Sequence, residues 1–170
     1  EDKYFYYHPG VNPVSIVRAV VNNLLSARKA SGASTITMQV ARLIAPKERT
    51  YLNKLTEVFR AFQLEWYYSK DEVLQLYLNL VPYGSNIEGV KSAALIYFQE
   101  PPGYLSLAQT VTLTIIPNRP SSLIIGKNNV LITEERNKWL RRFASQNLFA
   151  QQDIDDALME MTDVIRGDDH

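Results

Sequence analysis

Hydrogen-bonding side chains are concentrated in residues 31–44, SGASTITMQVARLI, which otherwise have the apolar spacing of a buried helix. On a helix capped by Ser34, the side chains of Thr35, Gln39 and Arg42 follow at intervals of four and three residues and share one face. The free N–H groups of a helix N-terminus suit an anion, and Arg42 adds a fixed cation. The pattern predicts a surface for phosphate or sugar oxygens, although a well-capped helix with a polar outer face would give the same pattern.

A second candidate group is the pair Lys54 and Glu57, three residues apart in a helix predicted over residues 50–68. With Ala61 and Glu65 they form one flank of that helix, and a flank can line a cleft. Beside the flank runs an apolar stripe that we expect to face the core: Leu55, Val58, Phe59, Phe62 and Trp66. Taken alone, Lys54 and Glu57 are more simply interpreted as a surface ion pair worth roughly 0.2–0.5 kcal/mol.

The first ten residues, EDKYFYYHPG, place two acids before a run of aromatic side chains. Aromatic surroundings remove water from a carboxylate and raise its pKa, which is how a glutamate becomes a useful proton shuttle. The alternative is an exposed, frayed terminus. His8 and His170 lie far apart without ligand spacing between them, so the sequence predicts no zinc site.

The composition is that of an ordinary globular chain of 170 residues, 46% hydrophobic and 21% charged. Eighteen basic residues balance eighteen acidic ones, which argues against a nucleic-acid binder held by bulk charge. The absence of cysteine excludes disulfides and a cysteine-based metal site. No apolar run is long enough to span a membrane, so we expect any membrane anchor to lie outside this chain. Charge is nevertheless uneven, because residues 42–54 hold four cations and one anion, a local net charge of +3.

The elements that must position these residues are helices, and the predicted fold class is mainly α. Apolar spacing predicts helices over residues 14–29, 34–44, 50–68, 87–98, 133–148 and 153–164. Capping-box patterns at Ser69–Glu72 and Ser106–Gln109 mark the starts of two more, the second of which ends at Pro117. No period-two run is long enough for a confident strand, and residues 117–130 are predicted to form a loop.

Four segments together resemble the peptidoglycan glycosyltransferase domain, glycosyltransferase family 51, of class A penicillin-binding proteins and monofunctional transglycosylases. They are EDKYFYYHPG, GASTITMQ, KLTEVFRAFQLE and YLNLVPYGSNIEGVKSAALIYF, in this order and at the expected intervals. The second and third segments are most similar to the penicillin-binding protein 1C type. The resemblance extends from Glu1 to about Ala157. It identifies residues 1–170 as one such domain that lacks its N-terminal anchor, with residues from about 158 to 170 forming a tail or the start of a linker.

This resemblance implies a lysozyme-like, mainly helical fold with a larger head lobe and a smaller, membrane-facing jaw lobe. It implies that the chain polymerises lipid II into glycan strands on the outer, periplasmic face of the bacterial cytoplasmic membrane. Its partners would be lipid II, the growing glycan strand and the membrane surface, with a C-terminal transpeptidase domain as a further expected neighbour. It also implies inhibition by moenomycin and no role for nucleic acid.

The resemblance assigns roles to individual residues. Glu1 falls on the general base, and Glu57 on the glutamate that assists departure of the diphosphate or stabilises the transition state. Arg42 and Lys54 match basic residues that hold the diphosphate. Asp2 matches the aspartate beside the base, where a divalent cation, Mg²⁺ or Mn²⁺, would be expected. The polar positions of the second motif are Ser34, Thr35 and Gln39.

The chemistry fits these residue types. A sugar 4-hydroxyl that attacks an anomeric carbon needs a base, best supplied by a carboxylate with a raised pKa. A lipid diphosphate is already a good leaving group, so it needs charge stabilisation more than protonation. A single displacement inverts the anomeric centre without a covalent sugar intermediate, unlike the retaining two-carboxylate case.

Four positions depart from the family pattern, and Thr112 and Thr114, at usual alanine and leucine positions, are two of them. The other two bear on the proposed activity. The arginine usual before the third-motif lysine is Asn53, which removes one cation, and a usual glutamate is Gln109, which still completes the capping box with Ser106. These departures leave open a weakened or inactive domain that binds lipid-linked glycan as a scaffold in a cell-wall complex. A third alternative is a glycan-cleaving enzyme on a related lysozyme-like fold, which would have no need for diphosphate-binding cations.

Overall fold

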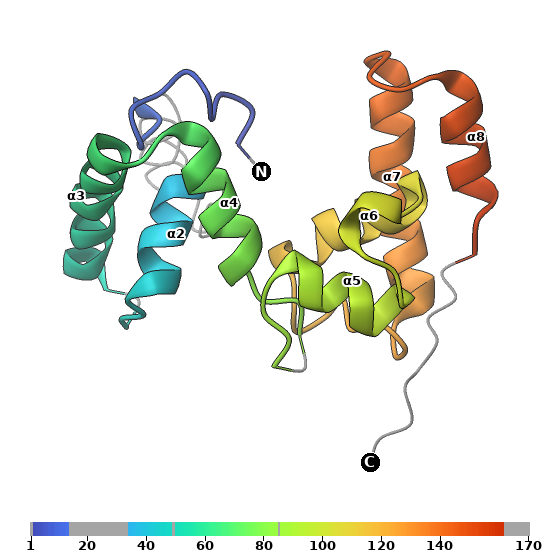
Figure 1. Ribbon diagram of the computed structural model, residues 1–170, viewed down its shortest axis with the longest axis horizontal. Helices are drawn as coiled ribbons and strands as arrows, with labels where there is room; N and C mark the ends of the chain where they lie inside the picture. Colours follow the sequence, from blue (N-terminus) through green and yellow to red (C-terminus); the bar gives the residue numbers. More distant parts are fainter. Residues whose placement is uncertain (1, 14–33, 49, 85, 162–170) are drawn as a thin grey trace, which may run out of the picture. The chain divides into compact units, whose positions relative to one another are not determined.

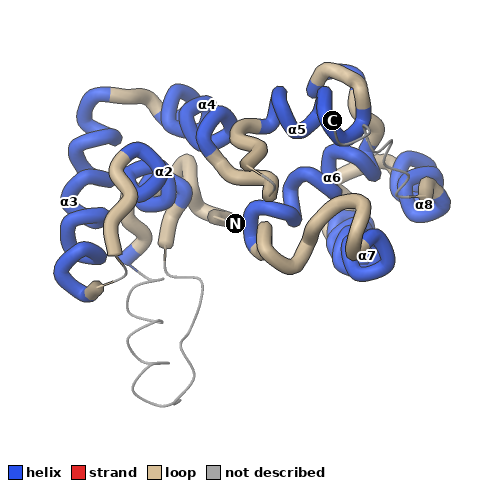
Figure 2. The backbone as a smooth tube through the Cα atoms, turned by 90° about the horizontal axis from the view of Figure 1, so that it is seen from below, coloured by secondary structure: helices blue, strands red, loops and turns tan. Residues whose placement is uncertain are grey.

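The computed structural model describes residues 2–13, 34–48, 50–84 and 86–161. Seven α-helices lie within this part of the chain: α2 Ile36–Ile44, α3 Tyr51–Tyr67, α4 Lys70–Leu80, α5 Val90–Phe98, α6 Leu107–Ile115, α7 Asn129–Ser145 and α8 Gln151–Met159. Two 3₁₀ turns, η1 Pro102–Tyr104 and η2 Ile116–Asn118, complete the elements. These described ranges hold no strand, only an isolated bridge between Pro82 and Glu88 (Figure 2). The predicted mainly α class is confirmed, whereas Glu1 and the helix predicted over residues 14–29 lie outside the described residues.

The chain divides into two compact units, Glu1–Leu80 and Val81–His170. In the first unit, α2 lies between α3 and α4 and contacts both (Figure 1). Val11, Met38 and Ala61 form a small buried cluster that joins residues 2–13 to α2 and α3. Because every site residue predicted above lies before Leu80, the first unit carries the candidate site.

The second unit is built around α6, which contacts α5, α7 and α8. Its predicted capping box is confirmed: the backbone N–H of Gln109 donates to Ser106 Oγ at 3.1 Å, and that of Ser106 donates to Gln109 Oε1 at 2.9 Å. The Gln109 side chain therefore serves the cap in place of the family's glutamate. On α7, the buried Arg136 donates from Nη2 to the carbonyl of Glu160 at 2.8 Å, which ties the end of α8 to α7.

Most helix boundaries agree with the predictions. Helix α3 begins after Thr50, which accepts a hydrogen bond from the backbone of Asn53, and α4 begins after a capping box of Ser69 and Glu72. Helix α5 begins three residues later than predicted because Gly89, at φ +80°, ends the turn that precedes it. Helices α7 and α8 begin and end earlier than predicted, and the start of α7 includes the apolar residues 130–132, of which Ile132 is fully buried.

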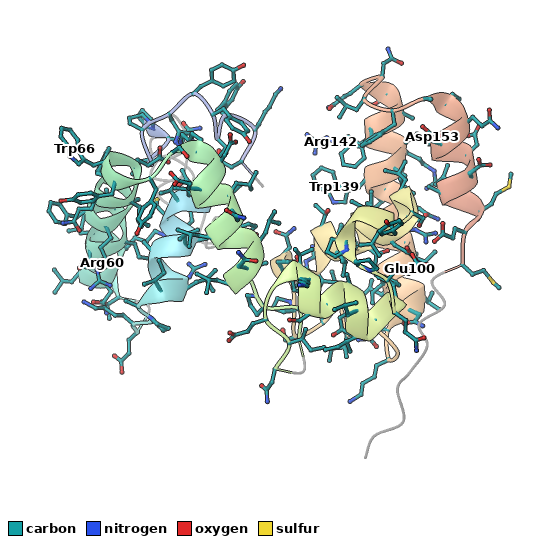
Figure 3. The ribbon with its side chains drawn as sticks, viewed as in Figure 1. Arg60, Trp66, Glu100, Trp139, Arg142 and Asp153 are labelled. Atoms are coloured by element: carbon teal, nitrogen blue, oxygen red, sulfur yellow. The ribbon has the colours of Figure 1, made fainter. Side chains whose placement is uncertain are left out.

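The apolar stripe of α3 was predicted to face the core, and this prediction is wrong for all of its residues except Val58, which packs against the buried cluster. Trp66 is 85% exposed and Phe59 63% exposed, and Figure 3 shows Trp66 pointing away from α2. The buried side of α3 is the flank that includes Ala61. Gly10 packs so closely there, at φ +77°, that a Cβ atom would come within 2.7 Å of the Ala61 carbonyl oxygen. The side chains of the polar flank therefore lie against residues 2–13 and α2.

Candidate functional site

The N-terminus of α2 is capped by Thr35, not by Ser34 as predicted. Thr35 is 2% exposed and has extended backbone angles, and its Oγ1 accepts a hydrogen bond from the N–H of Met38 at 3.1 Å. The same hydroxyl donates to the carbonyl of Gly10 at 2.6 Å. Since both its donor and an acceptor site are used inside the protein, Thr35 positions residues 2–13 on α2 rather than facing a ligand.

Ser34 is instead part of a contact that joins α3 to the segment before α2. The ammonium of Lys54 donates to Ser34 Oγ at 2.5 Å and to Glu57 Oε2 at 2.8 Å. The side chains of Lys54 and Glu57 are 39% and 17% exposed, so the pair is open to solvent on the lysine side. An ammonium has three N–H donors, and the third is not used by any of the described residues. The structure thus brings together Ser34, Lys54 and Glu57, three residues that the resemblance places in the family's motifs.

Gln39 and Arg42 follow on α2, both half-buried. Arg42 lies in the last turn of the helix, where a cation is favoured by the helix dipole. Within the described part of the chain, Arg42 has no ion-pair partner. Its guanidinium is therefore a positive charge that no carboxylate of the described residues neutralises.

Asp2 is held inside the first unit by two partners. Its carboxylate lies 3.0 Å from His8 Nε2 and accepts the N–H of Ile36, the first residue of α2, at 3.2 Å. Both Asp2 and His8 side chains are buried, and His8 Nδ1 has no hydrogen-bond partner among the described residues. No group of three potential metal ligands gathers among the described residues. The predicted cation at Asp2 stays a prediction.

One ring of the aromatic run after Asp2 is buried, and the other three are exposed. Tyr4, Tyr6 and Tyr7 are exposed, and only Phe5 is buried, with its ring edge-on to that of His8. Tyr6 donates to Asp71 at 3.0 Å, and this hydrogen bond raises the pKa of Tyr6. Because Glu1 lies outside the described residues, the expectation that these rings raise its pKa stays a prediction.

A second ionic contact was not predicted from the sequence. Lys70, in the first turn of α4, donates to Glu65 Oε1 and to the carbonyl of His8, both at 2.6 Å. Thr37 on α2 donates to the same Glu65 oxygen at 2.6 Å. The one sequence feature that pointed to this contact was Glu65, because it shares a helix flank with Glu57. Nothing in the sequence near Lys70 indicated that its side chain reaches residues 2–13.

The departure at Asn53 has a local structural role. Its side-chain Nδ2 donates to the carbonyl of Glu48 at 2.9 Å, so it orders the turn before α3. An amide cannot supply the positive charge that arginine carries in the family. Lys54 and Arg42 are the two described cations to which the resemblance assigns the diphosphate.

The profile of the transglycosylase family matches residues 1–144. The chain is 40% identical over 160 residues to penicillin-binding protein 1C of Escherichia coli K12. It is 38% identical over 162 residues to penicillin-binding protein 1A of the same organism and 37% identical over 155 residues to that of Neisseria gonorrhoeae. These matches cover 94%, 94% and 91% of this chain but only 21%, 19% and 19% of the three relatives.

Among solved structures, penicillin-binding protein 1A from Haemophilus influenzae superposes with a TM-score of 0.54. The match covers 76% of this chain and 17% of that one, at 22% sequence identity, and it supports the fold alone. The chain spans about a fifth of the length of the curated relatives that it matches. The resemblance indicated by the four motifs, including that to the 1C type, is confirmed by these comparisons.

Proposed function

The chain belongs to the transglycosylase family, and on that premise we propose that it is a peptidoglycan glycosyltransferase that polymerises lipid II into glycan strands. The observation that carries the proposal is the contact of Lys54 with both Ser34 and Glu57. Residues from two distant motifs meet there around a cation with a spare donor. Such a group can bind a diphosphate oxygen beside a carboxylate.

In the proposed reaction, the carboxylate of Glu1 takes the proton of the acceptor sugar 4-hydroxyl as its oxygen attacks the anomeric carbon of the donor. The bond from that carbon to the lipid diphosphate breaks, and the negative charge grows on the diphosphate. Lys54 and Arg42 stabilise this charge, while Glu57 holds the Lys54 ammonium and assists the departure. The anomeric centre inverts in this single displacement, and no step depends on the predicted Mg²⁺ or Mn²⁺.

The membrane surface is proposed as a partner of the first unit. Helix α3 exposes a row of large apolar side chains, and the chain nearby has a local charge of +3. In the described residues, no helix is both long and apolar enough to cross a bilayer. An exposed apolar face with adjacent cations suits an interfacial position on an anionic membrane. We therefore assign the first unit to the membrane-facing lobe of a lysozyme-like domain, at the outer face of the cytoplasmic membrane and within a longer protein.

The test uses the full-length protein with labelled lipid II in detergent, with and without moenomycin, and resolves products by size. A moenomycin-sensitive ladder of strands is expected, and Glu1→Gln should abolish it without changing the melting temperature. Wild-type-like turnover of Glu1→Gln would remove Glu1 as the base. A folded wild type that binds lipid II saturably but forms no polymer would favour the scaffold alternative, for which the loss of a cation at Asn53 is the supporting observation.

A further inference from the structure

We propose that Lys70 is a positioning residue for the reaction, because it holds the segment that carries Glu1 against α2 and α3. This inference rests on the proposed function. Lys70 belongs to α4 and is distant in sequence from residues 2–13, yet its ammonium donates to the His8 carbonyl at 2.6 Å. The contact joins the segment next to the general base to the most C-terminal helix of the first unit.

The ammonium of Lys70 has three partners. One is the His8 carbonyl and another is Glu65 Oε1, both at 2.6 Å. The third partner is the face of Phe5, whose ring centroid lies 4.6 Å from Nζ. Two of these three partners belong to residues 2–13, so Lys70 fixes both the backbone and the buried ring of that segment.

Glu65 links this cation to the helices that carry the rest of the site. Its Oε1 also accepts the hydroxyl of Thr37 on α2 at 2.6 Å. Glu65 lies on the same buried flank of α3 as Glu57. The ion pair of Lys70 and Glu65 therefore sets the position of residues 2–13 relative to both helices. Helix α2 carries Arg42, and helix α3 carries Glu57.

A second anchor of residues 2–13 is formed by the carboxylate of Asp2. The carboxylate of Asp2 lies 3.0 Å from the His8 ring and accepts the N–H of Ile36 at 3.2 Å. His8 is shared by both anchors, through its ring with Asp2 and through its carbonyl with Lys70. Because Asp2 directly follows Glu1 in the chain, loosening His8 frees the residue next to the proposed base.

Burial separates this ion pair from an ordinary surface pair. The Lys70 and Glu65 side chains are 18% and 10% exposed, against 64% and 22% for Lys138 and Glu135 in the second unit. Removing Lys70 leaves the largely buried carboxylate of Glu65 and the backbone carbonyl of His8 without their charged hydrogen-bond donor. Removing Lys138 leaves only groups that water can solvate.

The experiment compares Lys70→Met with the matched control Lys138→Met in the full-length protein. For Lys70→Met we expect kcat to fall on the order of 10- to 100-fold with little change in KM for lipid II, because a misplaced base slows the chemical step more than binding. Amide hydrogen exchange in residues 2–13 should quicken, while the interior of α3 stays protected. Lys138→Met should leave both quantities unchanged.

Lys70→Arg and Glu65→Gln keep the proposal testable if Lys70→Met is poorly folded. Arginine retains charged N–H donors and should recover part of kcat, and Glu65→Gln should lower kcat while retaining an acceptor for Lys70. The proposal is overturned if folded Lys70→Met keeps wild-type kcat, or if the fall appears only in KM. If wild-type protein forms no polymer, the proposed function fails, and the exchange of residues 2–13 alone decides whether Lys70 holds the segment.

Discussion

The ammonium of Lys54 lies 2.8 Å from the carboxylate of Glu57, one turn further along α3. The same ammonium reaches Ser34 Oγ at 2.5 Å, so the pair is also bound to the chain before α2. Because the lysine side chain is 39% exposed, the ion pair itself contributes at most about 1 kcal/mol to stability. Its importance is therefore expected in binding and catalysis rather than in folding.

Lys54→Met should lower glycan polymerisation on the order of 100-fold while changing the free energy of unfolding by less than about 1 kcal/mol. The methionine keeps the length of the side chain but removes the donor and the charge. Turnover of lipid II and urea denaturation measure the two effects, and Glu135→Gln serves as the control for breaking a helical i,i+3 pair. A loss of stability in proportion to the loss of activity would show that the pair is structural.

Arg42→Ala should weaken donor binding by about tenfold or more with little change in melting temperature, because the guanidinium has no carboxylate partner in the described residues. Titration of fluorescent lipid II and a thermal melt test this. Donor affinity equal to that of the wild type would remove Arg42 from the site.

Thr35→Val should destabilise the protein by about 2 kcal/mol, because it removes a buried helix cap and leaves the Gly10 carbonyl without its donor. Thr50→Val removes the cap of α3, which is exposed, and should cost about 1 kcal/mol or less. Urea denaturation of the two variants provides the comparison. Equal costs would contradict the role of Thr35 in holding residues 2–13.

Replacing Phe59 and Trp66 together by serine should reduce sedimentation with anionic vesicles and leave the melting temperature nearly unchanged. Both side chains are more than half exposed, so their removal leaves no cavity in the core. Serine at Leu148 and Phe149, exposed apolar residues of the second unit, is the matched control. A large fall in melting temperature would show instead that the α3 stripe is buried in the protein.

Tyr83→Phe should make stability less dependent on alkaline pH. Burial raises the pKa of Tyr83 from 10.0 to about 12, so the folded state holds this proton more tightly than the unfolded state. The stabilising contribution is complete below the unfolded pKa of 10.0 and is lost as pH rises through about 12. Urea midpoints at about pH 9 and about pH 11.5 should therefore differ less in Tyr83→Phe than in wild type. The exposed Tyr104→Phe should behave as wild type, and identical profiles for all three proteins would contradict the effect of burial.

The local features of the chain could be predicted from its sequence. The capping boxes of Ser69–Glu72 and Ser106–Gln109 and the extent of α3 depend on residues within one or two turns of each other, and all are confirmed. The family could also be predicted, because four motifs in order carry it. The ion pair of Lys54 and Glu57 followed from their spacing of three residues on one helix.

Tertiary structure decided which side of α3 is buried. Apolar periodicity indicates that a helix has two faces, but it does not say whether the apolar face meets the core or another apolar surface. In this protein Gly10 packs on Ala61, so the flank of α3 that includes Ala61 faces the core and most of the apolar stripe is exposed to solvent. The contacts of Lys70 with His8 and of Thr35 with Gly10 join residues 62 and 25 positions apart. Such pairs leave no periodic signal in the chain, and only folding brings their atoms within hydrogen-bond distance.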